Sequence, residues 1–400
     1  MESNIITQGI KYIGTEDTDL DLFEGQYIVP EGITYNSYLI DDEKFAILDT
    51  SDQRKTTDWM ANVERELGGR TPDYLIVHHM EPDHAANIRL MMDKYPTLTA
   101  VCSQKAVALI QRFFGVDFTS RIQVVKEGET LSLGRHTLQF FMAPMVHWPE
   151  VMMSYEQSDK ILFSADAFGK FGAFSLTADG SKGIGSMWGA TEEWACEARR
   201  YYFNIVGKYG NQVQAVLKKV APLGVKTICP LHGPVLAENL EYYIGKYNTW
   251  SSYAPEDQGV LVAYASIYGH TAKAAQVLAK ELEGAGVPKV VVSDLARSDM
   301  AEVIEDAFRY DRMVVMAPTY DAGLFPVMED FLNHLKAKNY SNRKVGIVEN
   351  GTWAPMAAKK MAEILSTLKN VTLCETTVTV KSSLSAESLA ALKQLAKELA

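Results

Sequence analysis

The chain has 400 residues, of which 47% are hydrophobic, so it is longer than one ordinary domain and able to bury two substantial cores. Its formal net charge of -11 excludes nucleic acid and anionic membranes as expected partners, because both would repel it, and favours a small soluble substrate or a basic protein. The four cysteines lack any CxxC spacing, which excludes a disulfide framework, a zinc ribbon and a rubredoxin-type iron site.

The N-terminal residues Met1–Asn4 lack the basic and then apolar order of a signal peptide. No apolar run approaches the roughly 20 residues that a membrane span needs. The scattered positions of the cysteines predict reduced thiols in the core. We therefore expect a cytoplasmic protein.

Short strands separated by turns are predicted for the first part of the chain. Apolar runs at 38–40 and 45–49 alternate with polar turns. A helix is predicted over 56–67 and a buried strand over 74–77. Hairpins followed by strand and helix alternation indicate two stacked sheets with helices outside.

The segment His79-Met80-Glu81-Pro82-Asp83-His84 follows this strand and carries four potential metal ligands. Residues two apart on extended chain point the same way, so His79 and Glu81 share one ion while Asp83 and His84 turn toward a second. The pattern is similar to the HxHxDH motif of the metallo-β-lactamase fold, with Glu81 in place of its second histidine. This extra anionic oxygen favours iron over zinc, and redox chemistry over hydrolysis. A histidine-rich surface turn is the alternative interpretation.

Three further candidate ligands stand alone, each at the end of an apolar run that predicts a strand. They are His147, Asp166 and His232. Functional side chains gather on loops at such strand ends. A carboxylate has two oxygens, so Asp166 is suited to bridge two cations, and Trp148 is placed to shield the site from water. Each residue taken singly would be interpreted as a core or turn residue, but their order after the motif favours ligands.

These residues resemble the flavodiiron proteins, also called A-type flavoproteins. The family pattern HxExDH, then H, D and H matches, without a gap, His79, Glu81, Asp83, His84, His147, Asp166 and His232. The resemblance spans nearly the whole chain, since it also covers residues 35–40, 147–149, 166–169 and 198–202. It implies two irons with Asp166 as the bridge. The first iron is assigned to His79, Glu81 and His147, and the second to Asp83, His84 and His232.

The other histidines have no place in this pattern; they are His78, His136, His270 and His334. His78 points to the opposite side of the strand from its neighbour His79, so packing beside the ligands is its expected role.

A polar stretch with proline and glycine predicts a linker over 251–258, which divides the chain into domains at 1–250 and 259–400. In the second domain, runs of β-branched residues alternate with segments of helical periodicity, which indicates a parallel sheet covered by helices on both faces. The five strands are expected at 260–265, 289–292, 313–316, 345–348 and 371–378. The predicted fold is thus a metallo-β-lactamase-like αββα sandwich followed by a flavodoxin-like, doubly wound, five-stranded parallel sheet.

Between the first of these strands and its helix stands a loop that offers backbone N–H groups and a helix N-terminus to a phosphate; it comprises Ser266, Ile267, Tyr268, Gly269, His270 and Thr271. It has neither the lysine of a triphosphate loop nor the second glycine of a pyrophosphate loop, so a monophosphate is implied. The loop resembles the flavodoxin phosphate loop and predicts FMN. A serine-rich helix cap is the alternative for this loop alone.

The next two strand ends agree with FMN, because their aromatic side chains are placed to stack on a flavin ring. The predicted contacts after the third strand are Pro318, Thr319, Tyr320, Asp321 and Gly323. Those after the fourth strand are Asn350, Gly351, Thr352, Trp353 and Ala354.

Two functions from different classes fit these features. The first, which the resemblance implies, is an oxidoreductase whose FMN passes electrons to a non-haem di-iron centre that reduces O2 to water, NO to N2O, or both. The second is a di-zinc hydrolase with an accessory flavodoxin domain. Glu81 and the completeness of the flavin loops favour the first. A pure electron-transfer protein is disfavoured, because it has no use for seven metal ligands.

The lack of a CxxC pair leaves no internal entry for electrons, so a separate donor is expected, such as a rubredoxin or a reduced flavin or deazaflavin carrier. Electrons tunnel usefully over only a short gap, and the predicted linker is short. We therefore expect the FMN of one chain to face the iron of another, in a head-to-tail homodimer or a dimer of dimers.

Overall fold

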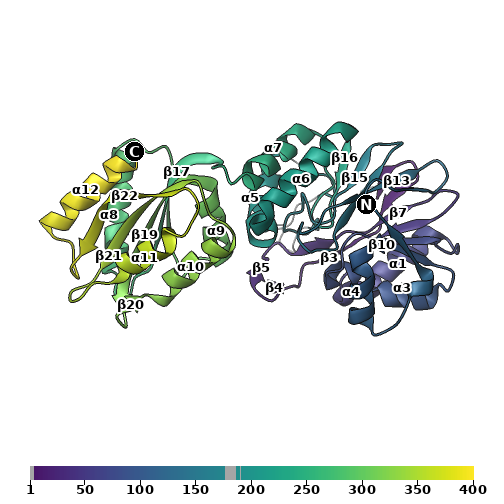
Figure 1. The fold of residues 1–400 in the computed structure, drawn as a ribbon, viewed down its shortest axis with the longest axis horizontal. Helices are drawn as coiled ribbons and strands as arrows, with labels where there is room; N and C mark the ends of the chain where they lie inside the picture. The colour runs from purple at the N-terminus through teal and green to yellow at the C-terminus, as the bar shows by residue number, and fades with distance from the viewer. Residues whose placement is uncertain (1–3, 176–185, 190) are drawn as a thin grey trace. The chain divides into compact units, whose positions relative to one another are not determined.

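A computed structural model of the chain describes residues 4–175, 186–189 and 191–400 (Figure 1). The chain forms two compact units. The first comprises Met1–Tyr202 and Asn211–Asn248, and the second comprises Phe203–Gly210 and Thr249–Ala400. In the described residues, no helix is both long and apolar enough to cross a membrane.

The first unit contains a seven-stranded sheet in the order β1-β2-β7-β8-β9-β10-β11. Its strands are β1 (Ile5–Thr7), β2 (Ile10–Tyr12), β7 (Tyr38–Ile40), β8 (Ala46–Leu48), β9 (Tyr74–Val77), β10 (Thr99–Ser103) and β11 (Ile122–Val125). Strands β8 to β11 run parallel, whereas β1, β2, β7 and β8 pair antiparallel. The predicted strands at 38–40 and 74–77 are both present.

A second, five-stranded sheet of this unit has the order β12-β13-β14-β15-β16. Its strands are β12 (Thr130–Ser132), β13 (Thr137–Met142), β14 (Met152–Glu156), β15 (Ile161–Phe163) and β16 (Thr227–Cys229). Two short antiparallel pairs also belong to this unit: β3 (Thr15–Asp17) pairs with β6 (Ile33–Tyr35), and between them β4 (Leu22–Phe23) and β5 (Tyr27–Ile28) form a hairpin. The sequence did not predict the β4–β5 hairpin, which lines the mouth of the candidate site.

The two sheets pack face to face, and helices cover them. Ile40 and Leu48 of the first sheet lie in one buried cluster with Phe140 and Phe163 of the second. The outer face of the first sheet is covered by α1 (Thr56–Leu67), α3 (Ile88–Lys94) and α4 (Gln104–Phe114), of which α1 buries Trp59. Figure 1 shows α5 (Thr191–Tyr201), α6 (Gly210–Val220) and α7 (Leu240–Ser251) on the side of β15 and β16. This arrangement confirms the predicted αββα sandwich.

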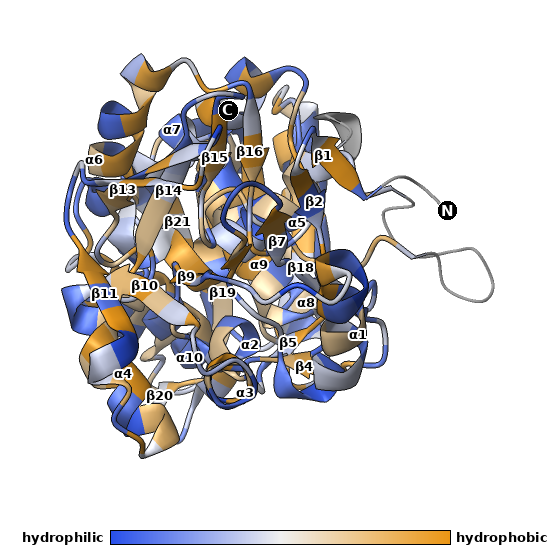
Figure 2. Cartoon of the chain, turned by 90° about the vertical axis from the view of Figure 1, so that its right-hand side faces the viewer, coloured by the Kyte–Doolittle hydropathy of each residue, from blue (hydrophilic) through white to orange (hydrophobic). Residues whose placement is uncertain are grey.

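Hydrophobic periodicity explains why these segments form these elements. Helix α1 spans the predicted residues and ends at Gly68, which adopts the left-handed conformation that a glycine permits (φ 57°). Figure 2 shows largely hydrophobic residues along β9 and β11, and hydrophobic patches beside hydrophilic ones along α4. A helix with two such faces packs one against the sheet and leaves the other in water.

The second unit is a parallel sheet in the strand order β18-β17-β19-β21-β22. Its strands are β17 (Asp257–Tyr264), β18 (Val290–Asp294), β19 (Tyr310–Tyr320), β21 (Arg343–Asn350) and β22 (Val371–Val380), all parallel to their neighbours. An additional short strand, β20 (Gly323–Leu324), pairs antiparallel with the end of β19 and was not predicted. The order confirms the doubly wound, five-stranded parallel sheet.

Helices lie on both faces of this sheet. Helix α8 (His270–Gly284) packs with α12 (Ala386–Glu398). Helix α10 (Pro326–Ala337) packs with α9 (Met300–Arg309) and with α11 (Ala357–Leu365). The segment Phe203–Gly210 also joins this unit, where the ring of Phe203 stacks on that of Phe308 with centroids 4.2 Å apart.

The cysteines differ in part from the expectation of core thiols. Cys102 and Cys229 are buried, but Cys196 is exposed and Cys374 is half-buried. Burial raises the pKa of the Cys102 thiol to about 12, so this thiol stays protonated at neutral pH. No disulfide joins the described residues, which include all four cysteines.

Candidate metal centre and cofactor cavity

The loop that carries the first candidate ligands begins where β9 ends, and Asp49 holds its start. Asp49 follows β8 with a left-handed backbone (φ 54°). Its Oδ1 accepts the backbone N–H of His78 at 2.8 Å and that of His79 at 3.4 Å. Pro82 then begins the short helix α2 (Pro82–Ala85), which sets the direction of Asp83. The backbone of the loop is therefore fixed before any metal is considered.

The end of the loop is held as firmly as its start. The backbone N–H and the hydroxyl of Thr50 both donate to the carbonyl oxygen of His84, at 2.8 and 2.7 Å. The side-chain amide of Asn87 donates to the carbonyl oxygen of Ser51 at 2.7 Å. The loop after β8 thus supports both ends of the ligand loop after β9.

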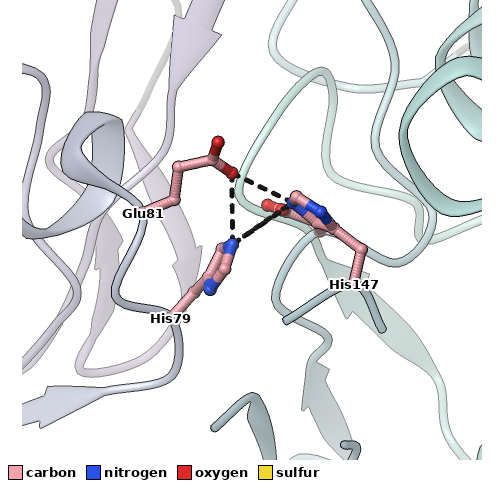
Figure 3. Close-up of side chains that lie close together, drawn as sticks. His79, Glu81 and His147 are labelled. Atoms are coloured by element: carbon pink, nitrogen blue, oxygen red, sulfur yellow. Dashed lines mark hydrogen bonds and ion pairs between the residues drawn. The ribbon is translucent and has the colours of Figure 1, made fainter. Parts of the chain in front are cut away.

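The first group of candidate ligands is formed by His79, Glu81 and His147 (Figure 3). Their ligand atoms converge: Oε2 of Glu81 lies 3.0 Å from Nε2 of His147 and 3.3 Å from Nε2 of His79. The two imidazole nitrogens are 3.4 Å apart. His147 reaches this point from the loop after β13, on the second sheet, so the group joins both sheets of the sandwich.

The second group comprises Asp83, His84 and His232, all of them buried. Nε2 of His84 lies 3.0 Å from Nε2 of His232, and Oδ2 of Asp83 lies 3.4 and 3.3 Å from these two nitrogens. His232 comes from the loop after β16. The motif spacing separates His79 and Glu81 from Asp83 and His84, and the structure places His147 beside the first pair and His232 beside the second, as the family resemblance implies.

Asp166 stands between the two groups and directs one oxygen to each. Its Oδ2 lies 3.3 Å from Nε2 of His79 and 3.1 Å from Nε2 of His147. Its Oδ1 lies 3.3 Å from Nε2 of His84 and 3.9 Å from Nε2 of His232. Ala165, just before it, has a left-handed backbone (φ 50°) that turns the carboxylate inward. This is the geometry of a bridging carboxylate.

These ligand sets fit two cations. An ion with bonds of about 2.1 Å to nitrogen and oxygen separates neighbouring ligand atoms by about 3.0 to 3.4 Å, which is the spacing within each group. Within the described part of the chain, the buried carboxylate oxygens of Asp83 and Asp166 have no hydrogen-bond partner. Buried anionic oxygens without a well-aligned hydrogen bond require compensating positive charge, from a metal ion or from the protonated imidazoles beside them. Imidazole combined with hard carboxylate oxygen suits iron.

The pKa shifts of the candidate ligands also indicate that the site favours added positive charge. Burial lowers the pKa of His147, but the adjacent carboxylates of Asp166 and Glu81 outweigh this and raise it to about 9. Burial raises the pKa of Asp166, but the imidazoles around it, His79 foremost, lower the pKa well below its usual range. Without a cation, protons on the histidines balance the carboxylates; with one, the metal takes that place.

Two of the candidate ligands are oriented through their other ring nitrogen. Nδ1 of His79 donates to Oε1 of Glu150 at 2.8 Å, and the same oxygen accepts the backbone N–H of Met80 at 2.9 Å. Nδ1 of His232 donates to the carbonyl oxygen of Thr34 at 2.6 Å. Such partners fix the tautomer and the ring plane of a metal-binding histidine. Glu150 was not predicted from the sequence, although its place three residues after His147 in the same loop could have indicated a role near the ligands.

His78 points away from the ligands, in agreement with its expected packing role. Its Nδ1 donates to Oδ2 of Asp49 at 2.5 Å, and its Nε2 lies 2.8 Å from the hydroxyl of Ser154 on β14. These three side chains are buried, so this Ser, His and Asp constellation is closed to a substrate. It joins the two sheets beneath the ligand loop.

An open cavity of about 230 Å³ lies beside the ligands Glu81 and Asp83, one from each group. The β4–β5 hairpin forms one wall of it through Leu22 and Phe23. The ring of Phe23 also meets the imidazole of His232 edge to face, with centroids 5.4 Å apart. A small molecule in this cavity therefore meets apolar side chains on the hairpin side and the charged side chains of Glu24, Asp52 and Arg54 beside Glu81 and Asp83.

Trp148 lies where the sequence analysis expected a water shield. Its ring meets that of His79 edge to face, with centroids 5.3 Å apart. On its other side it stacks on the ring of Phe113, at 6.4 Å and an interplanar angle of 12°. The two rings cover this side of the first ligand group.

In the second unit, a cavity of about 540 Å³ opens at the carboxyl ends of the parallel strands, which is where such sheets bind cofactors. Three of the predicted loops line it, through Ser266, Ile267, Tyr268, His270, Thr271, Pro318, Thr319, Asp321, Asn350, Gly351, Thr352 and Trp353. Gly269 makes the turn before α8 with a φ of 87°, and the hydroxyl of Ser266 accepts its N–H at 3.1 Å. The phosphate loop therefore closes on itself at the start of the helix.

The residues that line this cavity differ in part from the cofactor contacts that the sequence predicts. Gly269, Tyr320, Gly323 and Ala354 belong to the predicted loops but do not line this cavity. Ala322 and Ser382 line it and were missed. Ser382 follows β22, so the rule that strand ends carry functional loops, extended to the fifth strand, would have found it.

The cavity fits a planar aromatic cofactor with a phosphate. Its volume suits a molecule of this size. Tyr268 and Trp353 line it with side chains that are 91% and 83% exposed, which is unusual for large aromatic residues unless a ligand covers them. The turn before α8 supplies helix N–H groups to an anion.

Comparison with known families matches both units. Residues 33–233 match the family model described as ODP family beta lactamase. Residues 261–379 match a flavodoxin domain model. The two matches lie in the two units that carry the ligand groups and the cofactor cavity.

Individual relatives match over their full length. The chain is 30% identical to the nitric oxide reductase of Moorella thermoacetica, with 99% of this chain and 97% of that protein covered. It superposes on the rubredoxin oxygen:oxidoreductase of Desulfovibrio gigas with a TM-score of 0.91 and 26% identity, covering 100% of this chain and 98% of that one. The flavodiiron protein of Giardia intestinalis shares the fold, with a TM-score of 0.91, 24% identity, and coverage of 100% and 96%.

Proposed function

The chain belongs to the flavodiiron protein family, and from this premise we propose that it reduces O2 to water, NO to N2O, or both, at a di-iron centre supplied with electrons by FMN. The observation that carries the proposal is Asp166, whose two oxygens face two separate groups of histidine and carboxylate ligands. The hydrolase interpretation is less supported, because the relatives of known activity are named as reductases and an oxidoreductase.

We propose that each iron has three ligands of its own and shares Asp166. The first is held by His79, Glu81 and His147, and the second by Asp83, His84 and His232. When bound, a ferrous pair held by these residues would supply electrons for the reduction of a diatomic molecule, and FMN would supply up to two electrons to replace them.

The residues around the centre prepare it for this chemistry. Glu150 and the carbonyl of Thr34 hold the rings of His79 and His232, which keeps their Nε2 atoms on the metal positions. The apolar wall of Leu22 and Phe23 admits small neutral molecules to the cavity beside both groups. Trp148 covers the ring of His79, so water reaches this ligand from fewer directions.

The partners follow from this assignment. O2 and NO are the proposed substrates, because relatives of this chain are named a nitric oxide reductase and a rubredoxin oxygen:oxidoreductase. The proposed electron donor is a rubredoxin or a reduced flavin or deazaflavin carrier. We further propose a cytoplasmic, head-to-tail homodimer or dimer of dimers.

Metal and flavin analysis of natively expressed protein tests the proposal. We expect about two irons and one FMN per chain. Chemically reduced protein is then given O2 or NO in parallel assays, and we expect at least one of the two gases to be consumed. Zinc at full occupancy, with no consumption of either gas, would reject the oxidoreductase in favour of a hydrolase.

A further inference from the structure

The loop after the fifth strand of the second unit forms part of the cofactor cavity, although the sequence points to the first, third and fourth strands alone. Ser382 in this loop lines the cavity beside Thr352. Ser382 has a left-handed backbone (φ 66°). This conformation costs free energy in a residue other than glycine, so other contacts must hold it in place.

Asn350, the last residue of β21, supplies these contacts. Its Oδ1 accepts the backbone N–H of Ser382 at 3.0 Å, and its Nδ2 donates to the carbonyl oxygen of the same residue at 3.0 Å. The amide therefore pairs with both backbone polar groups of one residue, the N–H and the C=O of Ser382. We name this contact the Asn350 clasp. Next to it, the backbone N–H of Gly351 donates to the carbonyl oxygen of Val380 at 2.9 Å.

The same side chain reaches the phosphate loop. Nδ2 of Asn350 lies 3.5 Å from the hydroxyl oxygen of Thr271, at the start of α8. Asn350 is 8% exposed, whereas Ser382 is exposed, so a buried amide on the sheet holds a surface loop. One residue thus links the loops after the first, fourth and fifth strands at the cavity.

We propose that Asn350 is a positioning residue that fixes the loop after β22 as a fourth wall of the FMN cavity and presents Ser382 to the cofactor. This inference rests on the proposed FMN site and adds to it. A loop fixed before binding has less conformational entropy to lose when the ligand arrives, so the Asn350 clasp raises the affinity for FMN.

The test measures FMN binding to the metal-loaded, flavin-free protein by quenching of flavin fluorescence. Asn350→Ala removes the Asn350 clasp, and we expect its dissociation constant for FMN to rise at least tenfold. Ser382→Gly keeps both backbone partners and tolerates the left-handed conformation, so we expect a rise of at most about threefold. Asn333→Ala, an exposed asparagine on α10, is the matched control and should stay within twofold.

A second readout separates positioning from a general loss of stability. Hydrogen exchange of the flavin-free protein should show the Ser382 amide exchanging at least ten times faster in Asn350→Ala than in the wild type, with unchanged exchange in the central strands. If Asn350→Ala does not fold, Asn350→Asp replaces it, because it keeps the acceptor for the Ser382 N–H and loses the donor. Riboflavin is then used beside FMN, since it lacks the phosphate that the new charge would repel, and at least a fivefold loss is expected for both.

The outcomes distinguish this inference from the proposed function. If the wild type binds FMN tightly and the folded variants bind it within twofold, with Ser382 equally protected, the positioning role is rejected and the flavin site stands. If the wild type itself binds no FMN, the proposed function fails at its cofactor.

Discussion

At the scale of single residues, the centre depends on carboxylates that each contact more than one partner. The two oxygens of Asp166 face two ligand groups, and the two oxygens of Asp49 hold the backbone and the ring of His78. Glu150 acts on the ring of His79 and on the chain next to it. Replacing such a carboxylate therefore removes contacts to two partners at once.

Replacing the bridge should be far more harmful than replacing a buried thiol close to it in the fold. Asp166→Ala leaves both ligand groups without their shared anion, so we expect bound iron to fall below one per chain and gas consumption to fall at least about 100-fold. Cys229→Ala removes a small core side chain and should retain activity within about threefold. Equal losses in iron and activity would remove the bridging role from Asp166.

Glu150→Gln tests the orientation of His79. The amide keeps the size of the side chain, but it weakens the acceptor that holds Nδ1 of His79. We expect iron affinity, measured by competition with a chelator, to fall by about 10- to 100-fold. Glu43→Gln on the surface is the control and should bind iron as the wild type does. Unchanged affinity in Glu150→Gln would mean that the ring of His79 is fixed by packing alone.

At the scale of elements, the spacing of apolar residues predicted helices and strands correctly where a segment is long enough to show a single periodicity. The helix over 56–67 and the strands over 38–40 and 74–77 have the predicted bounds, because apolar spacing and the glycine stop agree. The two-residue strands of the β4–β5 hairpin and β20 are too short to show any period. The segment Phe203–Gly210 packs with residues of the second unit that are distant in the sequence, and no pattern within the segment itself predicts this.

The candidate site was predictable to a similar extent. The seven candidate ligands, which the structure brings together, could be named from the sequence because metal chemistry restricts residue type and the motif restricts spacing. Glu150 and Ser382 act through hydrogen bonds or a cavity wall, where many residue types would serve, so sequence alone does not single them out. The apolar wall made by Phe23 depends on how a hairpin folds over the centre.

Asp42 couples two loops of the first unit and predicts an acid-sensitive contact. Its carboxylate accepts the backbone N–H of His136 at 2.7 Å and that of Glu43 at 2.8 Å, and contacts Nδ1 of His136 at 2.8 Å. Burial raises the pKa of Asp42, but these hydrogen bonds outweigh it and lower the pKa from 3.8 to about 2. Because the folded pKa lies below the ordinary value, the stabilisation is complete above about pH 4 and is lost as the pH falls toward 2.

Denaturant unfolding of the metal-free protein at a series of pH values checks this. We expect Asp42→Asn to be less stable than the wild type at pH 6, and the difference to shrink as the pH falls from 4 toward 2.5. A difference that stays constant over this range would show that the charge of Asp42 contributes nothing to stability.

At the scale of the whole molecule, the candidate metal centre and the cofactor cavity lie in separate compact units, so the proposed electron transfer depends on how chains assemble. In the proposed head-to-tail homodimer, the FMN of one chain serves the irons of the other. A two-fold arrangement supplies both contacts at once.

Mixed dimers test this assembly. One chain carries Asp166→Ala and the other Gly269→Val, which disrupts the phosphate loop because a β-branched residue does not tolerate the backbone of Gly269 (φ 87°). The mixed dimer keeps one intact iron centre facing one intact flavin, so we expect activity well above that of either parent. Light scattering should show a dimer or tetramer. A fully active monomer, or a mixed dimer no more active than its parents, would reject the cross-chain path.

Transfer of electrons from flavin to gas through the metal centre is the central claim, and stopped-flow absorbance measures it most directly. Fully reduced protein is mixed with O2 or with NO, and the return of oxidised flavin is followed in the wild type and in iron-depleted protein that retains FMN. We expect oxidation by at least one gas to be at least about 100-fold faster in the wild type. Equal rates with and without iron would contradict the account, because the flavin would then react with the gas without the ligands around Asp166.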